Sequence, residues 1–285
     1  MDKNIYFFWE GDHLPFLEYL SMFSFRKQNP EWKILVIHKR YPGMCRWPTG
    51  EHKRPRSKQR NYFDQLPALN VEILDFDTEF REILSIDPKI AFVHAKDLAS
   101  WSILAHRGGI VSDTDILYIN PVSGLYNEFV ADSSKIGAIS FDNYPKKDYI
   151  PVSFMMGDKS ECFAQILCSA ISKYNPGVYE CSGTPAIPYK DIFEIKALFP
   201  GEVFRIHESV VFPFTHVNFV ESIDHVYKYN SRDLMPKSSI GIHWYGGNIN
   251  NDYNETNFHT FNNTLCQVIK EIVCQNHNSQ SVVLA

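Results

Sequence analysis

Apolar residues along the first 40 positions alternate between strand-like runs and a helical repeat. Residues 3–9 contain the run IYFFW, which predicts a buried strand, and residues 32–38 predict a second strand rich in β-branched side chains. Between them, the apolar residues of 15–27 recur at helical spacing, and Asn29-Pro30 ends that helix. The pattern therefore predicts a strand, a helix and a strand in this order.

The rest of the chain continues this alternation. The pattern predicts further strands at 71–74, 136–141, 153–156 and 240–244, and further helices at 97–106, 161–173 and 258–275. Residues 39–70 are typical of a loop with a basic run at 53–60, and residues 276–285 form a polar tail. Strands that alternate with helices indicate an α/β fold with a largely parallel sheet, here as one domain over residues 1–275.

Residues 108–119 are the most informative segment, because they place two aspartates inside an apolar run that begins with a double glycine. Residues i and i+2 of a strand point to the same side, so we expect Asp113 and Asp115 to face one spot. Adjacent carboxylates repel each other unless a cation lies between them, and Mg²⁺ and Mn²⁺ prefer such oxygen ligands. Gly108 and Gly109 either end the preceding helix or let the backbone approach a ligand. An Asp-x-Asp triplet alone also marks turns, but in this setting it predicts a metal and diphosphate site at a strand end.

Charge and hydropathy limit the partners. The net charge of −5 gives no support for nucleic acid or an anionic membrane as a partner. No apolar run reaches the roughly 20 residues that span a bilayer, although peripheral membrane contact stays open. Glu10 and Asp12 interrupt the apolar start of the chain, and the six cysteines include no Cys-x-x-Cys pair, which favours a reducing compartment. We therefore expect a cytoplasmic protein.

Residues 97–115 read DLASWSILAHRGGIVSDTD and resemble the sugar-transfer segment of GT-A glycosyltransferases. In that family an Asp-x-x-Arg helix leads to a double glycine and an Asp-x-Asp motif. The similarity is to the retaining group that contains initiating α-mannosyltransferases, capsular-polysaccharide transferases and clostridial glucosylating toxins. Further segments fall in the family's order: 5–11 (IYFFWEG), 24–32 (SFRKQNPEW), 154–160 (FMMGDKS), 182–185 (SGTP), 211–214 (VFPF) and 242–247 (IHWYGG).

The resemblance implies a GT-A fold, which is a Rossmann-like nucleotide-binding sheet flanked by helices. It implies a metal-dependent glycosyltransferase that moves a sugar from a nucleotide-sugar donor to a glycan or other hydroxyl acceptor. Residues 1–120 would form the half that binds the nucleotide-sugar, and residues 121–250 the acceptor-side half. Mn²⁺ or Mg²⁺ is the implied cofactor, UDP the favoured nucleotide, and retention the implied stereochemical outcome.

Several site residues follow from the same resemblance. Asp113 and Asp115 are the implied catalytic pair and, with His243, the implied metal ligands. Asp97 is expected to act with them by binding hydroxyls of the donor sugar. The residues expected to contact the nucleotide-sugar further include Phe8, Trp9, Gly108, Gly109 and Trp244, with Trp9 stacked on the base. Asp142, Glu180 and Glu208 are candidates for the acceptor side for another reason, since they lie near segment ends where loops could meet the acceptor.

One departure from the family pattern concerns the donor sugar. The arginine that follows the helix aspartate in the family falls on Ser100 here, and Lys96 is the nearby residue that can replace its charge. A milder change places Val111 where the family has a tyrosine or tryptophan. These changes leave the identity of the donor sugar open.

Two other functions remain alternatives at this point. A metal-dependent phosphatase or hydrolase of the Asp-x-Asp type has its nucleophile near the N-terminus, whereas the pair here begins at position 113 and is followed by Leu117. A non-catalytic protein that binds nucleotide-sugars fits the loss of the family arginine at Ser100.

Overall fold

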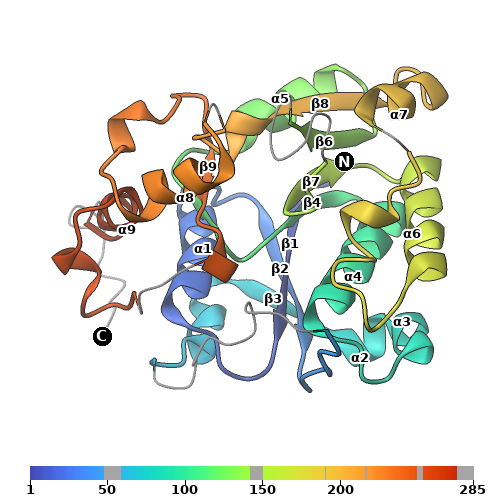
Figure 1. The fold of residues 1–285 in the computed structure, drawn as a ribbon, viewed down its shortest axis with the longest axis horizontal. Coiled ribbons are helices and arrows are strands. Elements are labelled where there is room, and N and C mark those ends of the chain that lie inside the picture. Colours follow the sequence, from blue (N-terminus) through green and yellow to red (C-terminus); the bar gives the residue numbers. More distant parts are fainter. Residues whose placement is uncertain (48–58, 142–149, 190, 216, 249–252, 275–285) are drawn as a thin grey trace.

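A central sheet with helices on both faces organises the computed structural model (Figure 1). The structure describes residues 1–47, 59–141, 150–189, 191–215, 217–248 and 253–274. Within these ranges the main sheet has seven strands in the order β3-β2-β1-β4-β7-β6-β8. The main-sheet strands are β1 (Asn4–Glu10), β2 (Lys33–Lys39), β3 (Val71–Asp75), β4 (Gly109–Ser112), β6 (Ile136–Ser140), β7 (Phe154–Gly157) and β8 (Val203–His207). A separate antiparallel pair consists of β5 (Ile116–Tyr118) and β9 (Gly241–His243).

The described helices lie between the strands and around the sheet. The α-helices are α1 (Phe16–Gln28), α2 (Phe76–Glu79), α3 (Arg81–Ile86), α4 (Phe92–His106), α5 (Ser123–Ala131), α6 (Glu161–Lys173), α7 (Ile192–Leu198), α8 (Phe219–Tyr227) and α9 (Thr264–Cys274). Short 3₁₀ helices are η3 (Phe63–Leu69), η4 (Thr184–Ala186), η5 (Glu208–Val210), η6 (Arg232–Leu234), η7 (Gly246–Asn248) and η8 (Phe258–Thr260). None of them has the length and apolar character that a membrane-crossing helix needs, within the part of the chain that the structure describes.

Strand direction changes across the sheet. Strands β3, β2, β1 and β4 run parallel, while β7 is antiparallel to both β4 and β6. Strand β8 is again parallel to β6. The predicted α/β fold is confirmed. The parallel strands are β3, β2, β1 and β4, and the aspartate pair follows β4.

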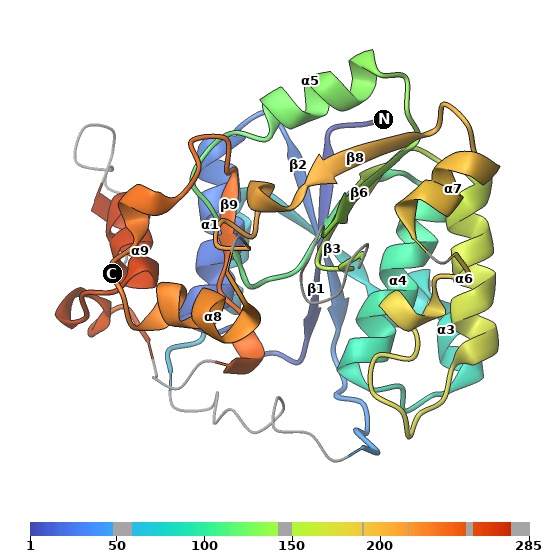
Figure 2. The same ribbon diagram turned by 45° about the horizontal axis from the view of Figure 1, so that its top comes forward.

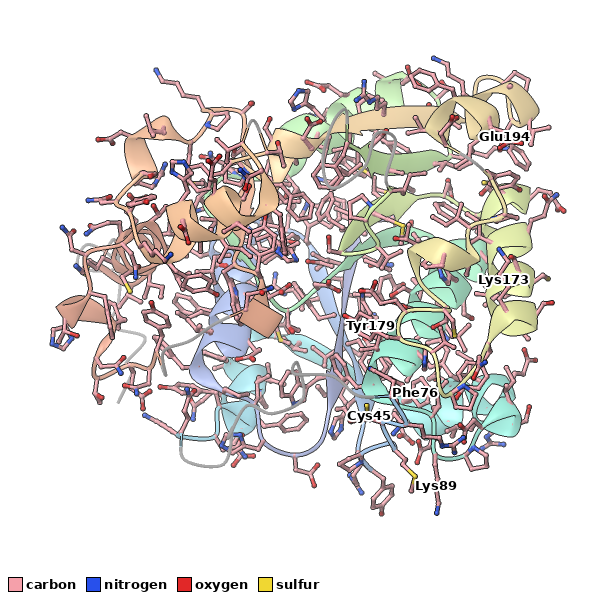
Figure 3. All side chains as sticks on the ribbon, in the orientation of Figure 1. Cys45, Phe76, Lys89, Lys173, Tyr179 and Glu194 are labelled. Atoms are coloured by element: carbon pink, nitrogen blue, oxygen red, sulfur yellow. The ribbon has the colours of Figure 1, made fainter. Side chains whose placement is uncertain are left out.

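Two cores form because side chains alternate along the strands. Ile5, Phe7 and Trp9 of β1 pack in the core that includes residues of α1, α5 and α9. Tyr6 and Phe8 point to the opposite face and pack in the core that includes residues of α3, α4 and α6. Figure 2 shows these two groups of helices on either side of the sheet, and Figure 3 shows the side chains that fill the space between them.

The prediction that one strand carries both Asp113 and Asp115 is wrong. Strand β4 ends at Ser112, and residues 113–115 form a turn before β5. The chain leaves the main sheet because β5 is hydrogen-bonded to α1. Ser21 Oγ donates to the Ile116 carbonyl at 2.6 Å, and the Tyr118 N–H donates to Ser24 Oγ at 2.9 Å. The two carboxylates are therefore brought together by a turn and not by strand alternation.

Other differences concern element bounds. The helix predicted at 97–106 begins earlier, at Phe92, and the one predicted at 258–275 begins at Thr264, after Asn263 accepts a hydrogen bond from the Cys266 N–H. Helices α2, α3, α5, α7 and α8 and strand β8 were not predicted. Most of the basic run (53–58) and the tail 276–285 lie outside the described residues. All six cysteines are free thiols.

Candidate functional site

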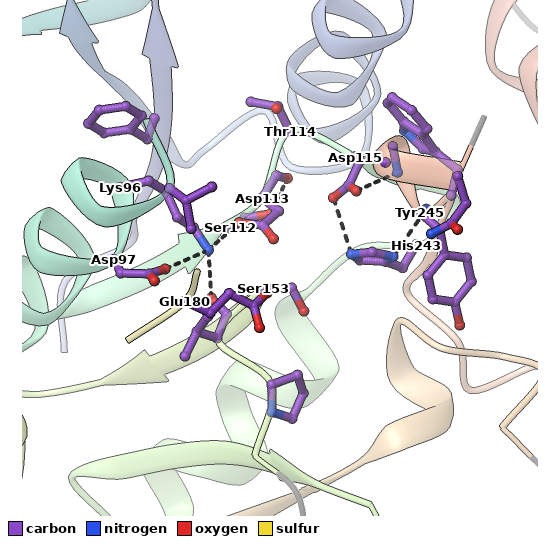
Figure 4. Close-up of a pocket in the computed structure, with 18 of the residues that line it drawn as sticks. Lys96, Asp97, Ser112, Asp113, Thr114, Asp115, Ser153, Glu180, His243 and Tyr245 are labelled. Carbon is purple, nitrogen blue, oxygen red and sulfur yellow. Dashed lines mark hydrogen bonds and ion pairs between the residues drawn. The ribbon is translucent and has the colours of Figure 1, made fainter. Parts of the chain in front are cut away.

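A cavity of about 460 Å³ opens at the carboxyl ends of β1 and β4. Phe8 and Trp9 near the end of β1, and Ser112 at the end of β4, form part of its lining. Helix α4 and the segment that follows β9 contribute further lining residues (Figure 4). The volume is in the range of pockets that hold small molecules and cofactors, and the position is where α/β sheets bind ligands.

Three potential metal ligands converge at one edge of this cavity. Asp113 and Asp115 lie in the turn between β4 and β5, and His243 ends β9, where it pairs opposite Ile116 of β5. A ligand atom of each residue lies within 4.8 Å of those of the other two. The side chains of Asp113, Asp115 and His243 are 26%, 19% and 11% exposed. The cluster is thus sheltered but open to the cavity.

Backbone groups fix the position of Asp115. The Gly246 N–H donates to Asp115 Oδ2 at 2.8 Å, and the Trp244 N–H donates to the Asp115 carbonyl at 2.8 Å. The other carboxylate oxygen, Oδ1, is buried and lies 3.2 Å from Nε2 of His243, and it accepts no well-directed hydrogen bond from the described residues. A buried carboxylate oxygen next to an imidazole nitrogen fits a shared cation, because both atoms are common metal ligands.

The ring of His243 is oriented by the chain that follows it. The Tyr245 N–H donates to His243 Nδ1 at 3.2 Å. The proton of the neutral ring therefore lies on Nε2, toward Asp115. With Nε2 as a metal ligand, the neutral ring would instead carry its proton on Nδ1, in place of the hydrogen bond from Tyr245.

Burial and like charges shift two of the site carboxyls upward. Burial raises the pKa of Asp97 to about 7; Lys96 opposes this rise, and the Asp113 and Glu180 carboxylates add to it. Burial also raises the pKa of Asp113, again opposed by Lys96 and supported by the Asp115 charge. Burial therefore favours the neutral form of both carboxyls, and the ammonium group of Lys96 favours the charged form.

Asp115 behaves in the opposite way. Burial alone would raise its pKa, but the neighbouring His243 ring and the Gly246 amide outweigh burial and lower the pKa to about 2. Asp115 is therefore a permanent anion at neutral pH, which is the protonation state that a metal ligand requires.

Lys96 supplies a cation on the other side of the aspartate pair. Its Nζ lies 2.6 Å from Asp113 Oδ1, 3.6 Å from Asp97 Oδ1, and donates to the Val152 carbonyl at 3.2 Å (Figure 4). The Lys96 side chain is 12% exposed and lines the cavity. Ser100, one helical turn later, has no charge, and its hydroxyl donates a hydrogen bond to the Lys96 carbonyl.

A turn after α6 holds Asp97 in place. Ser182 Oγ donates to Asp97 Oδ2 at 3.5 Å and lies 2.7 Å from Nδ1 of the buried His94. A Cβ atom on Gly183 would lie 2.7 Å from the same Asp97 oxygen. The turn at 182–183 thus leaves room for the Asp97 carboxylate and donates a hydrogen bond to it.

Solved structures share this arrangement of sheet and helices. The glycosyltransferase GlyE of Streptococcus pneumoniae TIGR4 is 11% identical, with a TM-score of 0.54 over 96% of this chain and 60% of its own. The bifunctional glycosyltransferase WbbM in its apo structure is 10% identical, with a TM-score of 0.51 over 95% of this chain and 49% of its own. The chain has the GT-A fold.

This likeness concerns the fold alone at such low identity. The PaToxG glycosyltransferase is 18% identical with a TM-score of 0.47 over 70% of this chain and 71% of its own. No family model and no curated protein sequence matches the chain. The chain spans about three fifths of GlyE and half of WbbM.

Within the GT-A fold, the predicted polar residues lie around one cavity. Asp97, Asp113, Asp115 and His243 all line it. Phe8, Trp9 and Trp244 also line it, although both tryptophans are 1% exposed and pack largely into the core. The rings of Phe8 and Trp9 each meet Phe92 edge-on, at centroid distances of 5.4 and 6.5 Å. Contact of these aromatic residues with a nucleotide remains a prediction.

The double glycine lies away from the cavity. Gly108 and Gly109 stand at the start of β4, with φ values of +72° and +119°, and neither is among the described cavity-lining residues. A Cβ on Gly108 would lie 2.9 Å from the Gly157 carbonyl oxygen, and one on Gly109 would lie 2.9 Å from that of Asn4. The conformation and the close backbone contacts explain both glycines without a ligand.

Several cavity residues were not predicted from the sequence. Ser153 carries a buried hydroxyl with no hydrogen-bond partner among the described residues. Phe212 and Tyr245 flank His243, with ring centroids 4.8 Å from the imidazole in each case. Tyr245 has a positive φ of 49°, as does the predicted acceptor-side candidate Glu180 at 54°, and this is backbone strain of the kind found at functional sites. The aromatic runs VFPF and HWYGG were the only sequence signal for Phe212 and Tyr245.

The acceptor-side candidates separate in the structure. Glu180 lines the cavity. Glu208 lies in η5 and is not among the described lining residues. Asp142 lies outside the described residues.

Proposed function

We propose that this protein is a metal-dependent glycosyltransferase that moves a sugar from a nucleotide-diphosphate sugar to a hydroxyl of a glycan or other acceptor. One observation carries the proposal: in a GT-A fold, Asp113, Asp115 and His243 converge at the edge of a cavity beyond the carboxyl ends of β1 and β4. The donor set is two carboxylates and an imidazole, which suits Mn²⁺ or Mg²⁺ together with phosphate oxygens.

The residues around the cavity divide the work of binding the donor. Asp115, held by the Gly246 amide, and His243 would hold the metal, with Asp113 as a third or water-mediated ligand. The bound ion would neutralise the charge that builds on the leaving diphosphate. Phe8, Trp9 and Phe92 form the aromatic end of the cavity, where a base would stack, and UDP is the favoured nucleotide from the sequence resemblance.

Asp97 would bind hydroxyls of the donor sugar. With a pKa of about 7 it exists in both protonation states near neutral pH, so it accepts a hydrogen bond as a carboxylate and donates one as an acid. Ser182 and Gly183 hold it in this position. The orientation of the sugar then depends on Asp97, and the orientation of the diphosphate depends on the aspartate pair.

Glu180, Phe212 and Tyr245 also line the cavity and would be available to contact the acceptor. Retention of configuration follows only from the sequence resemblance, and no enzyme nucleophile is assigned. A cytoplasmic location, the division into residues 1–120 and 121–250, and peripheral membrane contact likewise remain predictions.

A thermal-shift panel of nucleotide-sugars, with and without Mn²⁺, tests the proposal. A ligand that binds only the folded state raises the apparent melting temperature, so the donor should raise it only in the presence of metal. Incubation of that donor with candidate acceptors and NMR of the anomeric proton then give the linkage. Phosphate release from simple esters would instead favour a phosphatase, and metal-dependent binding without transfer to any acceptor or water would favour a binding protein.

A further inference from the structure

Of the described residues that line the cavity, Lys96 is the one with a permanent positive charge. Its ammonium group contacts Asp113 and Asp97 and donates to the Val152 carbonyl. It therefore lies between the carboxylate assigned to the metal and the carboxylate assigned to the sugar.

The charges around the cavity would weaken the contact between Lys96 and Asp113 once a metal binds. Five of the described acidic residues line the cavity, and Lys96 neutralises only part of their charge: Glu18, Asp97, Asp113, Asp115 and Glu180. A divalent ion at Asp113 and Asp115 would repel the ammonium group, because its charge would lie within a few ångströms of Nζ. At the same time, a diphosphate in the cavity would offer new negative oxygens to the same ammonium group.

We propose that Lys96 is an exchangeable counter-ion, which pairs with Asp113 before metal and donor bind and then contacts the diphosphate of the donor. The inference rests on the proposed function and names a residue that the Asp-x-Asp motif does not include. Both side chains line the cavity and are partly exposed, Lys96 by 12% and Asp113 by 26%, and the lysine stem is flexible. Ser100 presents no charge one helical turn away, so Lys96 carries the positive charge for this part of the site.

Two effects of opposite sign follow for a Lys96→Gln variant. Without nucleotide, Mn²⁺ should bind about tenfold more tightly than in the wild type, because the competing cation is gone while glutamine still donates hydrogen bonds. With saturating Mn²⁺, UDP should bind about tenfold more weakly, because the diphosphate loses a charged partner. A lysine with a purely structural role would weaken both ligands or neither.

The experiment measures free Mn²⁺ by electron paramagnetic resonance and UDP binding by calorimetry, using the full chain. Lys96→Arg keeps the charge and should leave Mn²⁺ affinity within about twofold of the wild type. Unchanged Mn²⁺ and UDP affinities in Lys96→Gln would overturn the inference. If the wild type itself bound neither ligand, the proposed function would fail instead, so the two failures are distinguishable.

A second comparison applies if Lys96→Gln does not fold. Asp113→Asn and the double variant Lys96→Met with Asp113→Asn both lack the Asp113 carboxylate, and they differ only in the ammonium group of Lys96. We expect the double variant to bind UDP about tenfold more weakly than Asp113→Asn alone, because only the latter retains the ammonium group. Equal UDP affinities in this pair would also contradict the inference.

Discussion

The Asp97 carboxylate occupies the space that a side chain on Gly183 would need. A Cβ atom on Gly183 would lie 2.7 Å from Asp97 Oδ2. The requirement for glycine is therefore steric and comes from a residue of the proposed donor site. A substitution at this position displaces Asp97 without direct contact with a ligand.

We expect Gly183→Ala to lower turnover by about tenfold to a hundredfold, because the alanine methyl displaces Asp97 from the sugar. UDP binding should be unchanged, since UDP lacks the transferred sugar that Asp97 is proposed to bind, whereas the UDP-sugar should bind more weakly. Calorimetry with both ligands makes the comparison. Equal losses of UDP and UDP-sugar affinity would mean that Asp97 does not bind the transferred sugar.

Gly124→Ala is the matched control for that variant. Gly124 lies in α5, and a Cβ there would meet nothing within 4 Å. Alanine should stabilise the helix by about 0.5–1 kcal/mol and leave both ligand affinities unchanged. Thermal unfolding of the two variants side by side separates the effect on the site from a general effect of adding a methyl group.

The buried histidine behind Asp97 predicts a dependence of stability on pH. Burial lowers the pKa of His94 to about 4, from about 6.5 in an unfolded chain. Between these values the unfolded chain takes up a proton that the folded chain does not, so stability falls as the pH falls from about 6.5 to 4. The slope for one such group is at most about 1.4 kcal/mol per pH unit. Urea unfolding of the wild type and His94→Gln at pH 7 and pH 5 should show a smaller loss in the variant; equal losses would contradict the assignment.

Asp97 should have the opposite effect on stability. Its pKa is raised to about 7 in the folded chain, so the folded chain keeps a proton that the unfolded chain loses as the pH rises from about 4 to 7. Its contribution therefore favours folding at low pH and is lost as the pH rises through 7. We expect Asp97→Asn to lose more stability on acidification than the wild type, because the His94 effect is then unopposed. A smaller loss of stability in Asp97→Asn would show that the pKa of the Asp97 carboxyl is not raised.

The sequence predicted the elements whose signals are local. The helix at 161–173 was placed with its observed bounds, because Ser160 caps it and its apolar residues follow a helical repeat. The end of β4 before the two aspartates could not be predicted, because it depends on hydrogen bonds from β5 to Ser21 and Ser24, which are distant in the sequence. The contact between Lys96 and Asp113 likewise depends on how α4 packs beside the end of β4, which no motif records.

Arg26 offers a test of the fold that should leave the site unaffected. Its guanidinium group donates to the carbonyls of Leu69, Pro30, Trp32 and Asn70 and so joins α1 to the segments before β2 and β3. Lysine cannot reach all these acceptors from one nitrogen, so Arg26→Lys should lose about 2–3 kcal/mol of unfolding free energy. Urea unfolding measures this loss, and UDP affinity should stay the same because Arg26 does not line the cavity. A loss below about 0.5 kcal/mol would contradict the role of this arginine.

The central claim is that Asp115 is a metal ligand on which nucleotide binding depends. The most direct measurement is calorimetric titration of UDP into the wild type and Asp115→Asn, each with and without Mn²⁺. Asparagine keeps an oxygen that accepts the Gly246 hydrogen bond, so the fold should persist while the anionic ligand is lost. We expect Mn²⁺ to strengthen UDP binding at least about tenfold in the wild type and to have no effect in Asp115→Asn. Metal-dependent UDP binding of the same strength in the folded variant would contradict it.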